Sequence, residues 1–125
     1  MFSHIMIGTN NLDNSKKFYD AVLGTVGVPP ARVDGHRIFY ITPGGVFSVT
    51  QPIDGKPATC ANGATIGFAC KSPDEVEAWH KAGLANGGKT IEDPPGVREG
   101  ATGKMYLAYL RDPDGNKICA LHRMR

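Results

Sequence analysis

The sequence predicts an α+β protein made of two tandem modules, each with the element order β-α-β-β-β. Three observations support this prediction: helical spacing of apolar residues in two separate segments, short strands bounded by glycine and proline turns, and repetition of this whole order along the chain. At 125 residues the chain is expected to form one domain. We place the first module at 1–52, a linker at 53–63 and the second module at 64–125.

The first module is expected to open on a strand at 2–8. In that segment Ile5 and Ile7 alternate with His4 and Met6, as in a strand that is buried on one face.

A helix is expected after this strand, because Asn11 is a good N-cap and apolar residues then recur at helical spacing as far as Gly24. The Asp34-Gly35 and Pro43-Gly44-Gly45 turns separate the strands that follow. These strands are predicted at 32–34, 37–42 and 46–51.

The same pattern starts again after the linker. A strand is predicted at 65–70, followed by the capping box Ser72-Pro73-Asp74-Glu75 with proline at the first helical position. Val76, Trp79, Ala82 and Gly83 form the apolar face of this second helix, which is expected to end at Gly87-Gly88. The last strands are predicted at 89–92, 104–111 and 117–123, with a loop at 93–103.

The two halves align directly. A shift of 61 residues places Ile5 on Ile66 and Phe18 on Trp79. Chance similarity is the alternative, but both the order of elements and the turns repeat. Neither half could bury its helix and its sheet face alone, so the halves should pack together. The predicted core is Ile5, Ile7, Phe18, Val22, Phe47, Val49, Ile66, Phe68, Trp79 and Ile118.

Composition limits the choice of partners and compartment. Fourteen basic and twelve acidic residues leave a net charge of +2 with no block of one sign, so no nucleic acid or membrane partner is expected. No apolar run approaches the ~18 residues of a membrane span. The N-terminus enters a strand pattern directly, so no signal peptide is expected. Three cysteines fit neither a disulfide framework nor a zinc ribbon, so a reduced cytoplasmic protein is the simplest interpretation.

Two segments carry a family resemblance. The run Arg-Asp-Pro-Asp-Gly-Asn-Lys at 111–117 resembles the closing hairpin of the vicinal oxygen chelate superfamily, which contains glyoxalase I, fosfomycin- and bleomycin-resistance proteins and extradiol dioxygenases. Segment 11–24, with Phe18-Tyr19 and Leu23-Gly24, resembles the first helix of that family. The resemblance implies the glyoxalase/bleomycin resistance fold, in which curved sheets form a cup around a pocket, usually in a homodimer. Bare sheet edges also favour a homodimer.

Enzymes of this family hold one divalent metal in the cup, with ligands from the first and last strand of each module. The resemblance places these positions at His4, at Ser48 (or Thr50 after a slip of two residues), at Thr65 and at Cys119. Only His4 matches the His, Glu or Gln ligands usual in the family. Neutral hydroxyls bind metals poorly, and one His with one Cys does not make the three protein ligands of a catalytic site. We therefore expect no metal or other cofactor, with a divalent metal as the less favoured alternative. The predicted pocket residues are His4, Met6, Ser48, Thr50, Thr65 and Cys119.

Gln51 and His122 are out of phase with these positions, and His122, close to the C-terminus, is expected to be solvent-exposed.

Three functions remain open. The first is a metal-free binder of a small molecule, similar to the bleomycin-sequestering members. The second is a glyoxalase-like lyase or related enzyme with an unusual metal site or with His4 as acid or base. The third is a vestigial cup with a role in assembly. The missing ligands favour the binder, and no catalytic residue is assigned.

Overall fold

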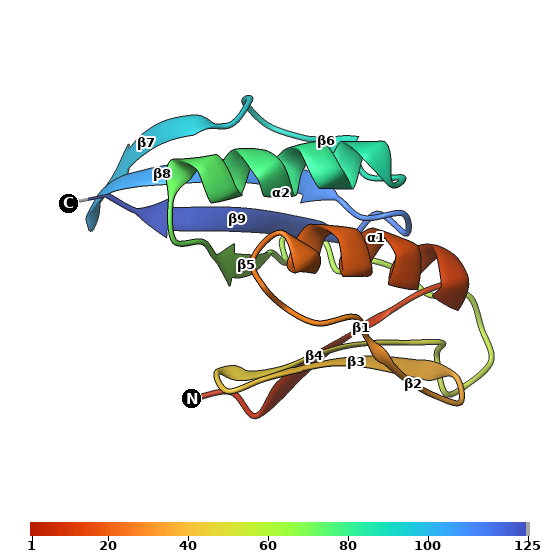
Figure 1. The fold of residues 1–125 in the computed structure, drawn as a ribbon. Helices are drawn as coiled ribbons and strands as arrows, with labels where there is room; N and C mark the ends of the chain where they lie inside the picture. The colour runs from red at the N-terminus through yellow and green to blue at the C-terminus, as the bar shows by residue number, and fades with distance from the viewer. Residues whose placement is uncertain (125) are drawn as a thin grey trace.

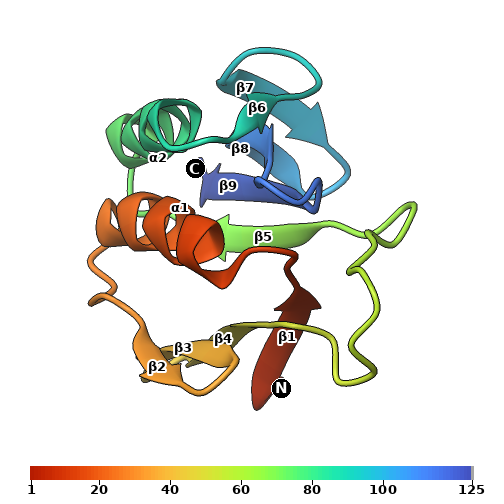
Figure 2. The same ribbon diagram turned by 90° about the vertical axis from the view of Figure 1, so that its right-hand side faces the viewer.

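The two halves of the chain fold into the same kind of unit, a small sheet with one helix on it (Figures 1 and 2). The computed structural model describes residues 1–124. Its elements are β1 (His4–Gly8), α1 (Leu12–Gly24), β2 (Arg32–Asp34), β3 (Arg37–Thr42), β4 (Gly45–Thr50), β5 (Ile66–Ala69), α2 (Pro73–Ala85), β6 (Lys89–Thr90), β7 (Gly96–Gly100), β8 (Gly103–Arg111) and β9 (Lys117–Arg123).

The sheets have matching topology. Strands β1–β4 form sheet 1 in the order β1-β4-β3-β2, and strands β5–β9 form sheet 2 in the order β5-β9-β8-β6, with β7 also paired to β8. In both sheets the first strand pairs in parallel with the last, and the other pairs are antiparallel. Residues 51–65 connect the sheets without helix or strand. The predicted α+β class with two tandem modules is confirmed.

The predicted loop at 93–103 is wrong, because Gly96–Gly100 forms β7 and pairs antiparallel with β8. Strands β6 and β7 pair with the same strand, β8, so they form one edge interrupted at 91–95. Pro94 and Pro95 lie in this interruption, and proline has no N–H to donate to a ladder. The prolines at 94 and 95 and the glycines at 96 and 100 are typical of loops, so the local sequence pattern did not predict this strand. The second module therefore contains one strand more than predicted.

Both helices begin at the predicted caps. The Asn11 side chain accepts a hydrogen bond from the N–H of Asn14 (3.0 Å), and the Ser72 hydroxyl accepts one from the N–H of Glu75 (3.1 Å). Each helix has 13 residues, and neither helix in residues 1–124 is long and apolar enough to cross a membrane.

The helices lie side by side, and each covers one face of its own sheet (Figure 1). Tyr19 of α1 contacts Phe47 of β4, with ring centroids 4.9 Å apart. Trp79 of α2 lies 6.5 Å from Phe68 of β5, and Phe68 lies 5.2 Å from Phe47. This chain of rings joins the two modules into one core.

The predicted core is confirmed for the residues that the helices cover. Phe18, Val22, Val49, Trp79 and Ile118 are fully buried and Phe47 is 8% exposed. Four predicted core residues on the edge strands β1 and β5 are only half-buried, because no further strand lies beyond them. These four are Ile5, Ile7, Ile66 and Phe68.

Gly83 allows α2 to approach sheet 2 closely. A Cβ atom at this position would overlap Leu110 Cδ1 and would press against Val22 and Phe18 of α1. A side chain at position 83 would therefore require the Leu110 side chain or the helix itself to shift.

A network around Asp112 ties the closing turn of the second module to the first module. Asp112 is 3% exposed, and its carboxylate accepts hydrogen bonds from the Tyr19 hydroxyl (2.7 Å), from the backbone N–H groups of Asp114 and Asn116 and from the Asn116 side chain. Burial, and then the neighbouring carboxylate, raise the pKa of Tyr19 well above its usual value, so its hydroxyl remains a donor. Asp114 in turn accepts hydrogen bonds from the N–H of Asn10 and the hydroxyl of Ser15.

We expect Trp79→Ala to lower the free energy of unfolding by roughly 3–5 kcal/mol, because the indole is fully buried and its removal leaves a cavity. Urea denaturation of the purified variant measures this loss. The matched control is Leu84→Ala on the same helix, where the side chain is 45% exposed and the loss should be small. A loss below about 1 kcal/mol for Trp79→Ala would contradict the packing described above.

Candidate functional site

Each sheet has a face that carries no helix, which we call its open face. Strand register identifies the residues of each open face, since directly paired residues point to the same side. On sheet 1, Met6 pairs with Ser48 and Ser48 with Phe39. Phe47 and its cross-strand partners, Ile5 and Tyr40, point to the other side, toward α1. On sheet 2, Cys119 pairs with Gly67 and with Tyr109 on the face turned away from α2.

The predicted pocket residues divide between the two sheets. His4, Met6, Ser48 and Thr50 belong to the open face of sheet 1, because the register pairs His4 with Val46, Met6 with Ser48 and Gly8 with Thr50. Cys119 belongs to the open face of sheet 2, and Thr65 lies directly before β5. The sheets meet through their helix-bearing faces, so the two open faces diverge within one chain (Figure 2). A single chain therefore does not bring all six residues together.

The side chains at the predicted metal positions do not fit the kind of divalent metal site that enzymes of the resembled family have. His4 is exposed, and its Nδ1 lies 2.8 Å from the Ser3 hydroxyl. Ser48 is fully buried with no hydrogen-bond partner for its Oγ, and Thr50 donates its hydroxyl to the Gln51 carbonyl. Burial raises the pKa of the Cys119 thiol, which disfavours the thiolate that metals bind. Within residues 1–124, no three His, Cys, Asp or Glu side chains gather as a metal site.

Neither Gln51 nor His122, the two residues out of phase with the metal positions in the sequence, occupies a strand position on an open face. Gln51 follows β4, is exposed, and donates its backbone N–H to the His36 carbonyl. His122 pairs with Tyr106 on the helix-bearing face of sheet 2. The expectation that His122 is solvent-exposed is wrong, because the ring is half-buried and its Nδ1 lies 3.0 Å from the Cys70 carbonyl.

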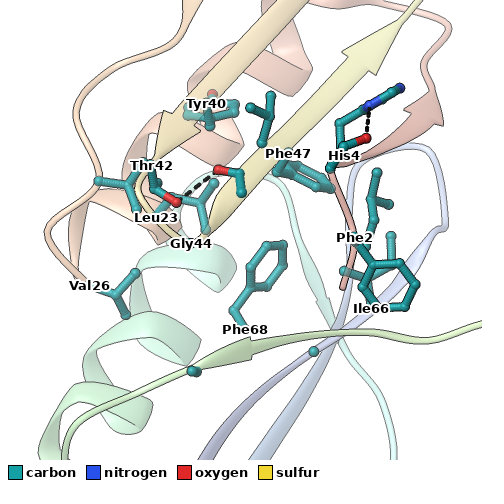
Figure 3. A pocket seen from close by; sticks show the side chains of 17 residues that line it. Phe2, His4, Leu23, Val26, Tyr40, Thr42, Gly44, Phe47, Ile66 and Phe68 are labelled. Carbon is teal, nitrogen blue, oxygen red and sulfur yellow. Dashed lines mark hydrogen bonds between the residues drawn. The ribbon is translucent and has the colours of Figure 1, made fainter.

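A cavity of about 380 Å³ lies between the helix-bearing faces, next to the edge strands β1 and β5 (Figure 3). Its walls are mainly aliphatic and aromatic, and Thr42 adds a hydroxyl that donates to the Gly45 carbonyl. His4 belongs to the rim, where its imidazole contacts Ser3. The principal apolar lining residues are Ile5, Val26, Tyr40, Phe47, Ile66 and Phe68.

Sequence reasoning did not find this cavity, because its lining residues have the same pattern as core residues. Four of the six, Ile5, Phe47, Ile66 and Phe68, are in the predicted core. The available signal was the position of Ile5, Ile66 and Phe68 on the first strand of each module, since first strands lie at the sheet edges in this topology.

Asp20 fixes the wall of this cavity through Tyr40. The Asp20 carboxylate accepts hydrogen bonds from the Tyr40 hydroxyl (2.8 Å), the Ala31 N–H (3.0 Å) and the Lys16 ammonium (2.6 Å). Partial burial acts to raise the pKa of Asp20, but these hydrogen bonds outweigh it and lower the pKa below its ordinary value.

Comparison with known proteins identifies the family. A sequence model of the Glyoxalase/Bleomycin resistance protein/Dioxygenase superfamily matches residues 1–120. The chain belongs to this superfamily. The membership predicted from the first helix and the closing hairpin is thereby confirmed.

Several known proteins and structures are similar to this chain. The crystal structure of a glyoxalase/bleomycin resistance protein from Albidiferax ferrireducens T118 is 63% identical, with a TM-score of 0.97 over 98% of this chain and 99% of that chain. A glyoxalase-related enzyme from Fulvimarina pelagi shares the fold at 20% identity, with a TM-score of 0.75 over 98% and 88% of the two chains. Virulence protein STM3117 from Salmonella typhimurium is 28% identical over 118 residues, which are 92% of this chain and 78% of that protein.

The lowered pKa of Asp20 leads to a prediction about acid stability. A carboxyl whose folded pKa lies below the unfolded value of about 3.9 contributes stability that is fully present above that value. This contribution is lost as the pH falls through the folded pKa. Asp20→Asn should therefore cost roughly 1–2 kcal/mol near neutral pH, and the difference from the unmodified protein should shrink below about pH 4.

Denaturant unfolding of both proteins from about pH 7 down to about pH 2.5 measures this difference. Asp93→Asn is the control, since Asp93 is exposed and its substitution should leave the pH profile unchanged. A difference between Asp20→Asn and the unmodified protein that stays constant over this range would contradict the prediction.

Proposed function

We propose that this chain binds a small molecule without a metal ion, in a cup formed by its open faces. One observation carries the proposal. At the four positions where the family resemblance puts metal ligands, the chain has an imidazole, two hydroxyls and a thiol, while the fold that shapes the cup is retained. A site that keeps its shape and lacks carboxylate ligands suits binding better than metal-assisted catalysis.

The open face of sheet 1 supports contact with an apolar ligand. Met6 is 39% exposed and Ile41 is 53% exposed on this face, and Phe39 beside them is half-buried. Exposed apolar side chains that share one face are typical of binding surfaces.

A second copy of the chain completes the proposed cup. The metal positions of the family come from both modules, but the open faces of the two modules diverge within one chain. The positions meet when sheet 1 of one copy faces sheet 2 of another. We therefore propose a homodimer with two shared cups, an arrangement that two-fold symmetry allows.

The inter-module cavity is a second candidate location for the ligand, favoured by its volume of about 380 Å³ and its apolar walls. It differs from the cup because its walls belong to the helix-bearing faces. Variants that block either the cup or the inter-module cavity, and leave the other unchanged, show which of the two locations holds the ligand.

The first prediction from this proposal concerns metal and ligand together. Purified protein should contain well under one equivalent of metal, and ligands found in a melting screen should raise Tm equally with and without a chelator. A micromolar metal site would instead contribute ~2.7 kcal/mol at a hundredfold excess of metal. Met6→Trp should abolish the ligand response, whereas the cavity-filling variant Val26→Phe should retain it. Stoichiometric metal that is lost in His4→Ala would overturn the metal-free proposal and favour the enzyme alternative.

A gain-of-function variant provides the converse test. Ser48→Glu, Thr65→His and Cys119→Glu combined should create metal affinity, because they restore carboxylate and imidazole donors at the family positions. The same three substitutions combined with His4→Ala are the control and should bind metal more weakly.

The second prediction concerns the shared cup. Met6→Trp blocks the open face of sheet 1, and Thr65→Trp blocks the site at the start of sheet 2. Each variant alone should bind no ligand. Mixing the two and allowing subunits to exchange should restore roughly a quarter of the sites, because half of the dimers are mixed and each mixed dimer has one intact cup. Sedimentation at micromolar concentration that shows only single chains would contradict the dimer, and the absence of restored binding would contradict the shared cup.

A further inference from the structure

We infer that the ligand of the proposed cup is an organic anion, with a carboxylate, phosphate or phosphonate group held by arginine on the open face of sheet 1. This inference rests on the proposed function and names the chemical class of its ligand.

The arginines of residues 1–124 are not spread over the surface. All five arginines in residues 1–124 lie on strands, and the register places each on an open face. Two lysines of the strands join them. The cations of the open faces are Arg32 and Arg37 on sheet 1, and Lys89, Arg98, Arg111, Lys117 and Arg123 on sheet 2.

The acidic residues are placed differently. Asp34, which pairs with Arg37, is the one carboxylate among the strand residues of the open faces within residues 1–124. Glu99 of β7 pairs with Lys104 on the other face of sheet 2. An ordinary solvated sheet face would carry both signs of charge. The strand residues of the open face of sheet 1 thus carry two cations and one carboxylate, and those of sheet 2 carry five cations, of which Lys117 is paired with Glu92.

These arginines lack charged partners in the described part of the chain. The ion pairs found in residues 1–124 join Lys16 to Asp20, Lys104 to Glu99 and Lys117 to Glu92, so none involves arginine. Where hydrogen bonds are present, the acceptors are neutral. Arg111 donates to the Gly115 carbonyl and Arg123 to the Thr102 hydroxyl.

Two buried polar groups without hydrogen-bond partners, one on Ser48 and one on Arg37, belong to the open face of sheet 1. Ser48 is fully buried, and neither its Oγ nor the buried Nε of Arg37 has a hydrogen-bond partner within residues 1–124. Arg37 pairs directly with Thr50, so Arg37 and Ser48 are diagonal neighbours on the open face. Buried donors without acceptors are costly, and an anion would supply acceptors to both.

The surroundings define the rest of the ligand. Guanidinium groups recognise carboxylate and phosphate oxygens through two parallel hydrogen bonds, which favours arginine over lysine for this task. Met6, Phe39 and Ile41 share the same face and offer contact to an apolar body. Arg32, opposite Phe39, adds a second cation, so the face remains positive after Asp34 is counted.

A matched series of probes tests this inference. Benzoate, phenylphosphonate, benzamide and benzylammonium have the same ring and differ in charge. Isothermal titration of the unmodified protein should show binding of the two anions, weakened by added salt, and little binding of the neutral and cationic probes. Arg37→Gln should weaken anion binding about tenfold or more, and Arg37→Lys should restore only part of it. The exposed helix residue Lys81 provides the control Lys81→Gln, which should bind as the unmodified protein does.

Amide chemical shifts locate the bound probe. Benzoate should shift the signals of Phe39, Ser48 and Thr50, and shifts at Tyr40 and Phe68 would place it in the inter-module cavity and overturn the inference. Equal binding of benzoate and benzamide, or unchanged binding in Arg37→Gln, would also overturn it. If benzamide binds at the open face and benzoate does not, the proposed cup stands and the anion class is wrong. If no probe binds, both are wrong.

Discussion

The hydrogen bond between Tyr19 and Asp112 joins the two modules, and the rest of the structure depends on how these modules pack. Tyr19 is in the first helix, and Asp112 opens the turn before the last strand, 93 residues later. A buried carboxylate is costly unless donors surround it, and Asp112 has the Tyr19 hydroxyl, two backbone N–H groups and the Asn116 amide. Because these donors come from both modules, satisfying Asp112 requires the modules to pack in one relative position.

That relative position decides which faces meet. Phe47 and Phe68 come into contact from the helix-bearing faces, so these faces form the core and the open faces diverge. The edge strands β1 and β5 separate at the end of this core, which leaves their isoleucines half-buried beside a cavity. The fold therefore creates two environments that differ in polarity. The cavity between the modules is apolar, whereas the open faces combine apolar side chains with arginine.

The superfamily fold is retained here with a different set of polar groups. Hydroxyl, thiol and a single imidazole stand where the resemblance leads one to expect carboxylate and imidazole ligands. In a site without a metal ion, fixed cations can hold the oxygens of a ligand, and we propose this role for the guanidinium groups of the open faces. The missing family ligands and the arginines on the open faces are thus consistent with each other, and both support the proposal that a ligand binds through the protein's own side chains.

The sequence by itself determined the modules, the helices and most of the core. Asn11 and Ser72 cap the helices, and Phe18 and Trp79 are buried at equivalent places, because capping and periodicity are local properties. Strand β7 could not be predicted, since its pairing with β8 overrides the proline and glycine signals around it. The position of the open faces was also beyond local reasoning. Alternation predicts that His4 and Met6 share a face, but only the packing of Phe47 on Phe68 and the hydrogen bonds of Asp112 decide where that face points. Those contacts join residues far apart in the chain, and no local pattern encodes them.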